Sequence, residues 1–140
     1  MNQIKNYTTR DQIGKIINIL PSESADMYYA YGENKPELLP YPDSCLKMMC
    51  LPCWSVGALL NFIPDEIEYC NAIYTINIRK SKLTKEISLY QIAYGNYKFY
   101  EDGSSSWKDM INTGQHENLI NACIDIILWL KENKIISKIQ

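Results

Sequence analysis

The feature that most constrains the fold is an apolar stripe in the last part of the chain. From about residue 116 to residue 133, apolar side chains recur at helical spacing. One helical face carries Leu119, Ile120, Cys123, Ile126, Ile127 and Leu130. A helix with such a face is stable only when the face is buried against other elements. We therefore expect a long C-terminal helix that packs into a core.

Two shorter helices are expected earlier in the sequence. Thr9 and Gln12 have the spacing of a capping box, and isoleucines follow at helical intervals until Pro21. Ser55 is a suitable N-cap for a second short helix, which Pro64 follows. Between these two helices, residues 32–43 are rich in proline and are expected to form a surface loop.

After the second helix the apolar period changes to that of strands. Residues 72–79 alternate in polarity and predict one strand, and residues 86–94 predict another. Gly95-Asn96 indicates a two-residue hairpin turn into a third strand at 96–101, and residues 101–109 are expected to form a loop. The predicted fold class is α+β, a single domain over 1–140. It consists of a three-stranded antiparallel meander packed against helices, with a long C-terminal helix.

Charge and cysteine content limit the expected cellular location and the expected partners. The chain of 140 residues has a net charge of −2, which gives no general attraction to nucleic acid or to an anionic membrane. Its apolar runs are too short to cross a bilayer, and its first residues lack the apolar core of a secretory signal. The cysteine count of 5 is odd, which favours reduced thiols. These observations predict a cytoplasmic protein without a membrane partner.

Cys50 and Cys53 form the most specific local pattern, a Cys-x-x-Cys pair before the helix at Ser55. A thiolate near a helix start is stabilised, and such pairs form reversible disulfides, but the parallel βαβ unit of thioredoxin-like proteins is not predicted here. A zinc site would also need Cys45 and Cys70, and it would lack the usual second close pair. Burial of the sulfur atoms is the favoured interpretation, with Cys50 and Cys53 as an alternative redox pair. No cofactor and no metal are expected.

Two other activities are kept as alternatives. A small thiol-dependent enzyme would use Cys53 or Cys50, with His116, the single histidine, brought close in space. A weak nucleic-acid binder would use residues 79–85, a predicted loop with four positive charges. Since the rest of the chain is not basic, nucleic acid is not the expected partner.

The chain has 11 tyrosines, and several fall in the predicted strands. Both faces of the second strand are apolar, so either helices cover both faces or one aromatic face is left for a partner. We expect the C-terminal helix to cover one face of strand 72–79, the face that carries Ala72, Tyr74, Ile76 and Ile78. The opposite face would then present tyrosines to a protein partner or to a second copy, most simply in a two-fold dimer. The predicted members of this surface are Tyr90, Tyr94 and Tyr100.

Four segments carry a resemblance to other proteins. The most specific is Trp-Ser-x-Gly-Ala-Leu-Leu at 54–60, and the others lie at 7–12, 24–27 and 119–130. By these segments the chain resembles small uncharacterised proteins encoded in the genomes and prophages of gut Bacteroidetes. The resemblance implies a phage or mobile-element setting and a compact α+β domain, and it brings no catalytic residue. Cys50 is not part of the shared pattern, which favours a structural role for the segment.

The sequence therefore predicts a non-enzymatic protein-interaction module that binds another protein or itself. It also predicts that Trp54 and the apolar stripe of the last helix share one core, because a domain of this size has room for one.

Overall fold

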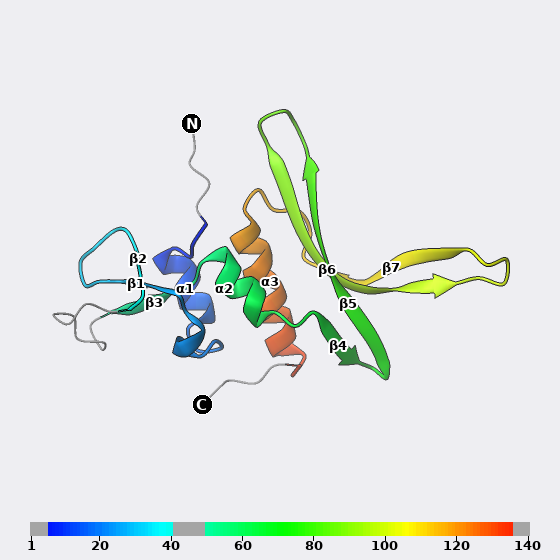
Figure 1. Cartoon of the computed structure of the whole chain (residues 1–140), viewed down its shortest axis with the longest axis horizontal. Coiled ribbons are helices and arrows are strands. Elements are labelled where there is room, and N and C mark those ends of the chain that lie inside the picture. The colour runs from blue at the N-terminus through cyan, green and yellow to red at the C-terminus, as the bar shows by residue number, and fades with distance from the viewer. Residues whose placement is uncertain (1–5, 41–49, 136–140) are drawn as a thin grey trace.

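The computed structural model describes residues 6–40 and 50–135. This part of the chain is a mixed α+β fold with three α-helices, one short 3-10 helix and two antiparallel sheets (Figure 1). The helical elements are α1 (Arg10–Ile16), η1 (Ser22–Ser24), α2 (Val56–Phe62) and α3 (Leu119–Glu132). The strands are β1 (Met27–Tyr29), β2 (Glu37–Leu38), β3 (Leu51–Cys53), β4 (Glu66–Tyr69), β5 (Ala72–Lys82), β6 (Ser88–Phe99) and β7 (Ser105–Asn112).

The helix starts follow from local capping. The Thr9 hydroxyl accepts a hydrogen bond from the amide of Gln12, and the Gln12 side-chain oxygen accepts one from the amide of Thr9, so the predicted capping box of α1 is confirmed. Ser55 caps α2 as predicted by accepting from the amide of Ala58. Asn118 caps α3, the long C-terminal helix, which begins three residues later than His116.

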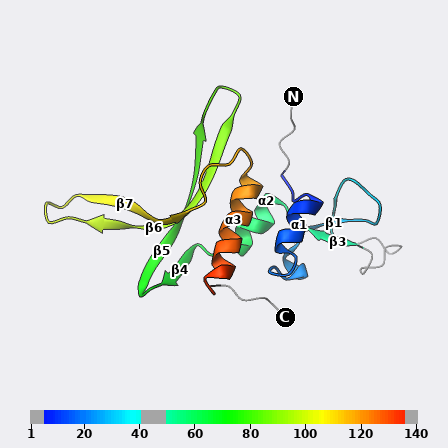
Figure 2. The same ribbon diagram turned by 180° about the vertical axis from the view of Figure 1, so that it is seen from behind.

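The core lies between the helices and the larger sheet. Figures 1 and 2 show α3 between that sheet on one side and α1 and α2 on the other. Trp54 has an exposed fraction of 0% and belongs to the same cluster of buried residues as the α3 stripe, which confirms the predicted common core. Its indole Nε1 donates to Ser24 Oγ at 2.9 Å, so the polar end of the ring is satisfied as well.

The smaller sheet has the order β2-β1-β3 and lies beside α1, at the opposite end of the molecule from the larger sheet (Figure 1). Strand β2 falls within the segment predicted as a proline-rich loop, so that prediction is wrong at Glu37 and Leu38. Those two residues pair with Tyr28 and Met27 of the preceding strand, and strand pairing of this kind leaves no signal in local composition. The rest of the predicted loop beyond Pro40 lies outside the described residues, as does Cys45.

The larger sheet has four strands in the order β4-β5-β6-β7, where the sequence predicts a three-stranded meander. Ile76 is opposite Tyr94, and Ile78 is opposite Ile92, so these side chains share one face. This face packs on α3, and both Ile92 and Tyr94 have an exposed fraction of 0%. The predicted covering of strand β5 is confirmed at Ile76, which packs against the core, but not at Ile78, which is 45% exposed.

The predicted hairpin turn at Gly95-Asn96 is wrong. Strand β6 continues through both residues, and the register with β7 shifts between Tyr94 and Gly95. Gly95 is required for a different reason. A Cβ atom at this position would lie 2.3 Å from the carbonyl oxygen of Lys108 and 2.8 Å from the Trp107 ring. The glycine therefore permits the close approach of β6 and β7, whereas the sequence suggests a hairpin turn at this position.

The chain reverses instead at Asp102-Gly103, inside the predicted loop. Gly103 has a φ of +86°, and Asp102 accepts hydrogen bonds from the amide and hydroxyl of Ser104. Strand β7 begins directly afterwards, so residues 105–109 form a strand and not the expected loop. The serines that open this strand have low strand propensity, which hid it in the sequence.

Candidate interaction surface

Two long hairpins extend from the larger sheet away from the helices, and they diverge from each other (Figure 1). We call residues 79–89, from β5 and β6, the basic arm. We call residues 96–108, from β6 and β7, the aromatic arm. Among the described residues, none between 95 and 109 belongs to the buried core or packs against it. The aromatic arm is therefore held by its own strand pairing and by contacts at its base.

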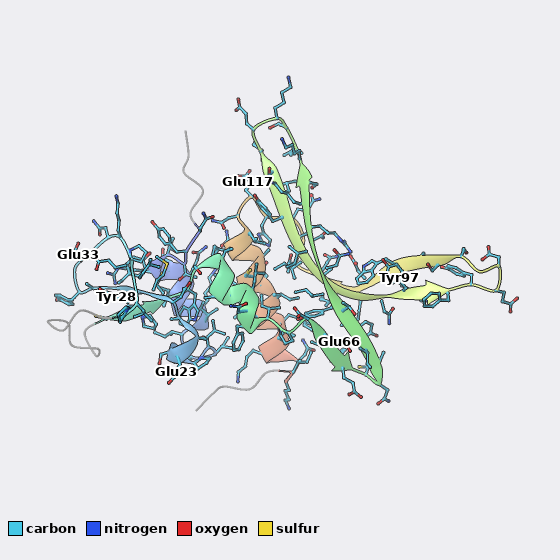
Figure 3. All side chains as sticks on the ribbon, viewed as in Figure 1. Glu23, Tyr28, Glu33, Glu66, Tyr97 and Glu117 are labelled. Carbon is cyan, nitrogen blue, oxygen red and sulfur yellow. The ribbon has the colours of Figure 1, made fainter. Side chains whose placement is uncertain are left out.

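The aromatic arm exposes large apolar side chains. The exposed fractions are 59% for Tyr97, 81% for Phe99 and 52% for Tyr100. Figure 3 shows Tyr97 well away from the helices. Its ring meets the Trp107 ring edge-on, with 5.3 Å between the centroids. Exposed aromatic side chains gathered on one projecting element are typical of a contact surface.

An ion pair joins the two arms at their junction. The guanidinium of Arg79 on β5 makes two hydrogen bonds with the carboxylate of Asp109 on β7, across the intervening strand β6. Trp107 donates its Nε1 hydrogen to the same carboxylate at 2.6 Å. Hydrogen bonding from Arg79, followed by that from Trp107, lowers the pKa of Asp109, while partial burial opposes the shift. The carboxylate is therefore charged at neutral pH. It orients the Trp107 indole, whose ring contacts Tyr97.

The basic arm differs from its prediction as a loop. Arg79, Lys80 and Lys82 lie on strand β5, and only residues 83–87 form the connection to β6. Residues 79–82 are all polar, so the apolar alternation that indicates a strand is absent from the end of β5, and this part of the sequence resembles a solvated loop. Lys80 lies over the Tyr90 ring, with its Nζ 5.8 Å from the centroid. Since Arg79 is paired with Asp109, three lysines supply the positive charge of this arm.

The tyrosines predicted to form one surface have three different environments. Tyr94 is buried in the core and donates its hydroxyl hydrogen to the carbonyl of Pro64, so its predicted place on an uncovered face is wrong. The cause is register, because Tyr94 lies opposite Ile76 on the face that α3 covers. Burial raises the pKa of Tyr94 far above its usual value. Tyr90 is half-buried near α3, and Tyr100 is exposed at the end of the aromatic arm.

The cysteine pair is not a paired redox site in this structure. Cys50 takes part in a disulfide, whereas Cys53 is a free thiol, so the two are not bonded to each other. The predicted reduced state is therefore wrong for Cys50, because an odd count of cysteines excludes only complete pairing. Cys53 is fully buried, and its sulfur accepts from Thr8 Oγ1 at 3.4 Å. Burial raises the pKa of the Cys53 thiol, which disfavours the thiolate that a nucleophile requires.

His116 contributes to structure at the base of the basic arm. Its backbone pairs with Tyr90 of β6, at 2.6 Å and 2.9 Å, and its Nε2 lies 2.7 Å from a carboxylate oxygen of Asp125 on α3. These contacts tie the arm to the helix. Since the side chain of His116 lies beside Asp125 whereas the sulfur of Cys53 contacts Thr8, the alternative pairing of this histidine with Cys53 is not supported.

A hollow of about 620 Å³ lies between η1 and the start of α2. Three of its polar side chains are already hydrogen-bonded. Asp26 accepts hydrogen bonds from the amide and the hydroxyl of Ser55, and Ser24 Oγ accepts from the Trp54 indole. No histidine lines this hollow, so the Ser55–Asp26 contact lacks the base that would activate a serine.

Sequence reasoning missed Tyr97, Phe99 and Trp107, which dominate the aromatic arm. The signal that identifies them is Asp102-Gly103, a stronger turn sequence than Gly95-Asn96. Placing the turn there extends β6 through Phe99 and assigns Trp107 and Asp109 to the same face of the next strand. The Arg79–Asp109 contact has no such local signal, because it joins strands that are distant in sequence.

Comparisons of the chain with family models, curated proteins and solved structures found no match. No helix in the described ranges has both the length and the apolar character needed to cross a bilayer. Within the same ranges, no group of three or more histidine, cysteine, aspartate or glutamate residues is placed to hold a metal ion.

Proposed function

We propose that this protein is a non-enzymatic interaction module that binds a protein partner through the aromatic arm. The observation that carries the proposal is the exposure of Tyr97, Phe99 and Tyr100 on a hairpin that does not pack against the core of the described chain. Tyrosine and phenylalanine are enriched at the centres of protein interfaces, where their rings bury area at small entropic cost. A phage or mobile-element setting and a cytoplasmic location remain part of this proposal.

The rigidity of the arm supports the same function. The Asp109 carboxylate fixes the Trp107 indole, and Trp107 supports the Tyr97 ring. Side chains that are held before binding lose less conformational entropy when a partner covers them. The Arg79–Asp109 ion pair also fixes the base of the arm relative to its neighbour. The aromatic arm thus presents a preorganised surface.

The two alternative functions have less support. The thiol-dependent enzyme would need an accessible thiolate, and Cys53 is buried with a raised pKa. Cys50 would first have to be released from its disulfide. A nucleic-acid binder would rest on the basic arm, where Lys80, Lys82 and Lys85 remain for phosphate contacts once Arg79 is paired. So few contacts give weak and strongly salt-dependent binding.

Photo-crosslinking tests the proposal at a single side chain. Phe99→p-benzoylphenylalanine places a reactive ring on the aromatic arm, and Lys15→p-benzoylphenylalanine places the same ring on the exposed surface of α1 as a control. In cells that express the protein, we expect the probe at position 99 to give a discrete protein adduct that the probe at position 15 does not give. Mass spectrometry of the adduct then identifies the partner.

Adducts that are equally frequent at both positions would show that the arm has no special partner. Adducts with nucleic acid at position 99 would contradict the proposal directly and would support the binding of nucleic acid.

A further inference from the structure

We propose that the partner of the aromatic arm is a second copy of this chain, joined in a two-fold dimer in which each aromatic arm meets the basic arm of the other copy. This inference rests on the proposed function, and it adds the identity of the partner. It follows from the opposite charges at the ends of the two arms and from the way in which the arms diverge.

The ends of the two arms carry charges of opposite sign. In the turn of the aromatic arm, residues 100–104 include Glu101 and Asp102 and no basic residue. Hydrogen bonds from the side chain and amide of Ser104 lower the pKa of Asp102, so this carboxylate is charged at neutral pH. The end of the basic arm, residues 80–86, has three lysines against Glu86 alone. All of these charged side chains are exposed.

The two ends cannot meet within one chain, because the arms point in different directions (Figure 1). A two-fold rotation that turns two copies to face each other brings the acidic turn of each aromatic arm against the basic end of the other copy's basic arm. The contact forms twice and leaves no unmatched end, so the assembly closes as a dimer. The opposite charges also select this arrangement over one that pairs like arms.

The aromatic side chains lie on the side of the sheet that such a partner would approach. Tyr97 is opposite Trp107, and Gly95 is opposite Asp109, which binds Arg79, so all these residues share the face away from α3. Tyr97 and Phe99 are two residues apart on β6 and therefore project from that same face. A second copy that faces the diverging arms covers these two rings, while the charged ends fix its orientation.

Charge reversal followed by mixing tests the arrangement. Lys82→Glu/Lys85→Glu makes the basic arm acidic. Glu101→Lys/Asp102→Asn makes the acidic turn basic and keeps a side-chain oxygen for the Ser104 amide. The controls are Lys35→Glu and Glu33→Lys, in the exposed loop at the far end of the molecule, where Figure 3 labels Glu33. Sedimentation equilibrium measures the molecular mass of each protein alone and of mixtures.

We expect the unchanged protein and both controls to form dimers that dissociate more readily as salt increases. Each reversed variant alone should dissociate at least about 10-fold more readily, since its contacts then pair like charges. An equal mixture of the two reversed variants should dimerise again, because every contact in the mixed dimer joins opposite charges.

The proposal is overturned if the unchanged chain is monomeric, if the reversed variants dimerise like the controls, or if their mixture stays monomeric. A monomeric chain whose position 99 still crosslinks to a different protein would leave the proposed function intact and remove only the second copy as partner. Circular dichroism of each variant confirms that a loss of dimer is not a loss of fold.

Discussion

The helical body, by which we mean α1, α2, α3 and the core around them, buries its large apolar side chains, whereas the aromatic arm exposes them. In the body, Trp54, Leu59 and Leu130 have exposed fractions of 0%, whereas on the arm Phe99 is 81% exposed. Both regions are regular secondary structure. The body owes its order to burial of apolar surface, and the arm owes its order to strand pairing, one close glycine contact and an ion pair at its base. A protein can therefore hold aromatic residues ordered and exposed when a separate core supplies the stability.

The largest effect is expected in the body, from Trp54→Ala. Removing a fully buried indole that also donates to Ser24 should lower the free energy of unfolding by about 3–5 kcal/mol. Urea denaturation measures the loss, and Trp107→Ala on the arm is the matched control with a smaller expected cost. Equal losses for the two variants would mean that the arm and the body share one stabilising core.

Gly95→Ala should damage the arm by steric overlap. The new methyl group would have to displace both the Lys108 carbonyl and the Trp107 ring, which we expect to cost about 1–3 kcal/mol. Faster hydrogen exchange of the β7 amides, with unchanged exchange in α3, would locate the damage in the arm. Gly14→Ala is the control, because nothing lies within 4 Å of its added atom and alanine favours the helix α1. Unchanged hydrogen exchange in β7 of the Gly95 variant would show that the close approach at Gly95 does not stabilise the arm.

Asp109→Asn should have a smaller effect, under about 1 kcal/mol, because both partners of the ion pair are partly exposed. The lowered pKa of Asp109 sets the sign of the pH dependence. The stabilisation is present above the pKa of the unfolded carboxyl, about 3.9, and is lost as the pH falls through the lower folded value. Unfolding measured from pH 7 downward should show this loss in the unchanged protein and a flatter profile in the variant. Parallel profiles would show that the pair contributes nothing to the junction.

The smallest effect on stability is expected for Phe99→Ser on the arm. An exposed ring contributes little to folding, so the free energy of unfolding should change by about 0.5 kcal/mol or less. The same variant should lose the partner contact that the exposed ring provides. A change that affects binding and spares folding is the reverse of the result expected at Trp54. If Phe99→Ser destabilises the chain as strongly as a core substitution, the arm is not an independent surface.

The body was predictable because its signals are local. The capping residues Thr9 and Ser55 and the apolar stripe of α3 each act within a few positions of the chain, and the structure confirms all three. The α+β class follows from the change of apolar period between the helices. The larger sheet was harder, because which strands pair and which face is buried depend on register across the chain.

Two particular residues show where the prediction of the surface failed. Gly95 allows both a turn and a close strand contact, and only the position of Trp107 in space decides between them. Tyr94 is chemically suited to an exposed aromatic face or to a core, and its place opposite Ile76 decides for the core. The sequence predicts Tyr90 and Tyr94 as exposed aromatic residues, whereas the structure exposes Tyr97 and Phe99, because β6 continues past Gly95.

The three tryptophans lie in different environments, so their fluorescence can report separately on the helical body and on the aromatic arm. Trp54 is enclosed in the body, Trp129 of α3 lies beside Tyr69 with 5.5 Å between their ring centroids, and Trp107 lies half-buried on the arm beside Tyr97. Indole emission shifts to shorter wavelength when water is excluded from the ring. Occupation of the arm should therefore shift the emission of Trp107 while Trp54 stays unchanged, and unfolding of the body should shift Trp54 in the opposite direction. Comparison of the unchanged protein with Trp107→Phe would assign the shift on binding to Trp107, because that variant should lose it.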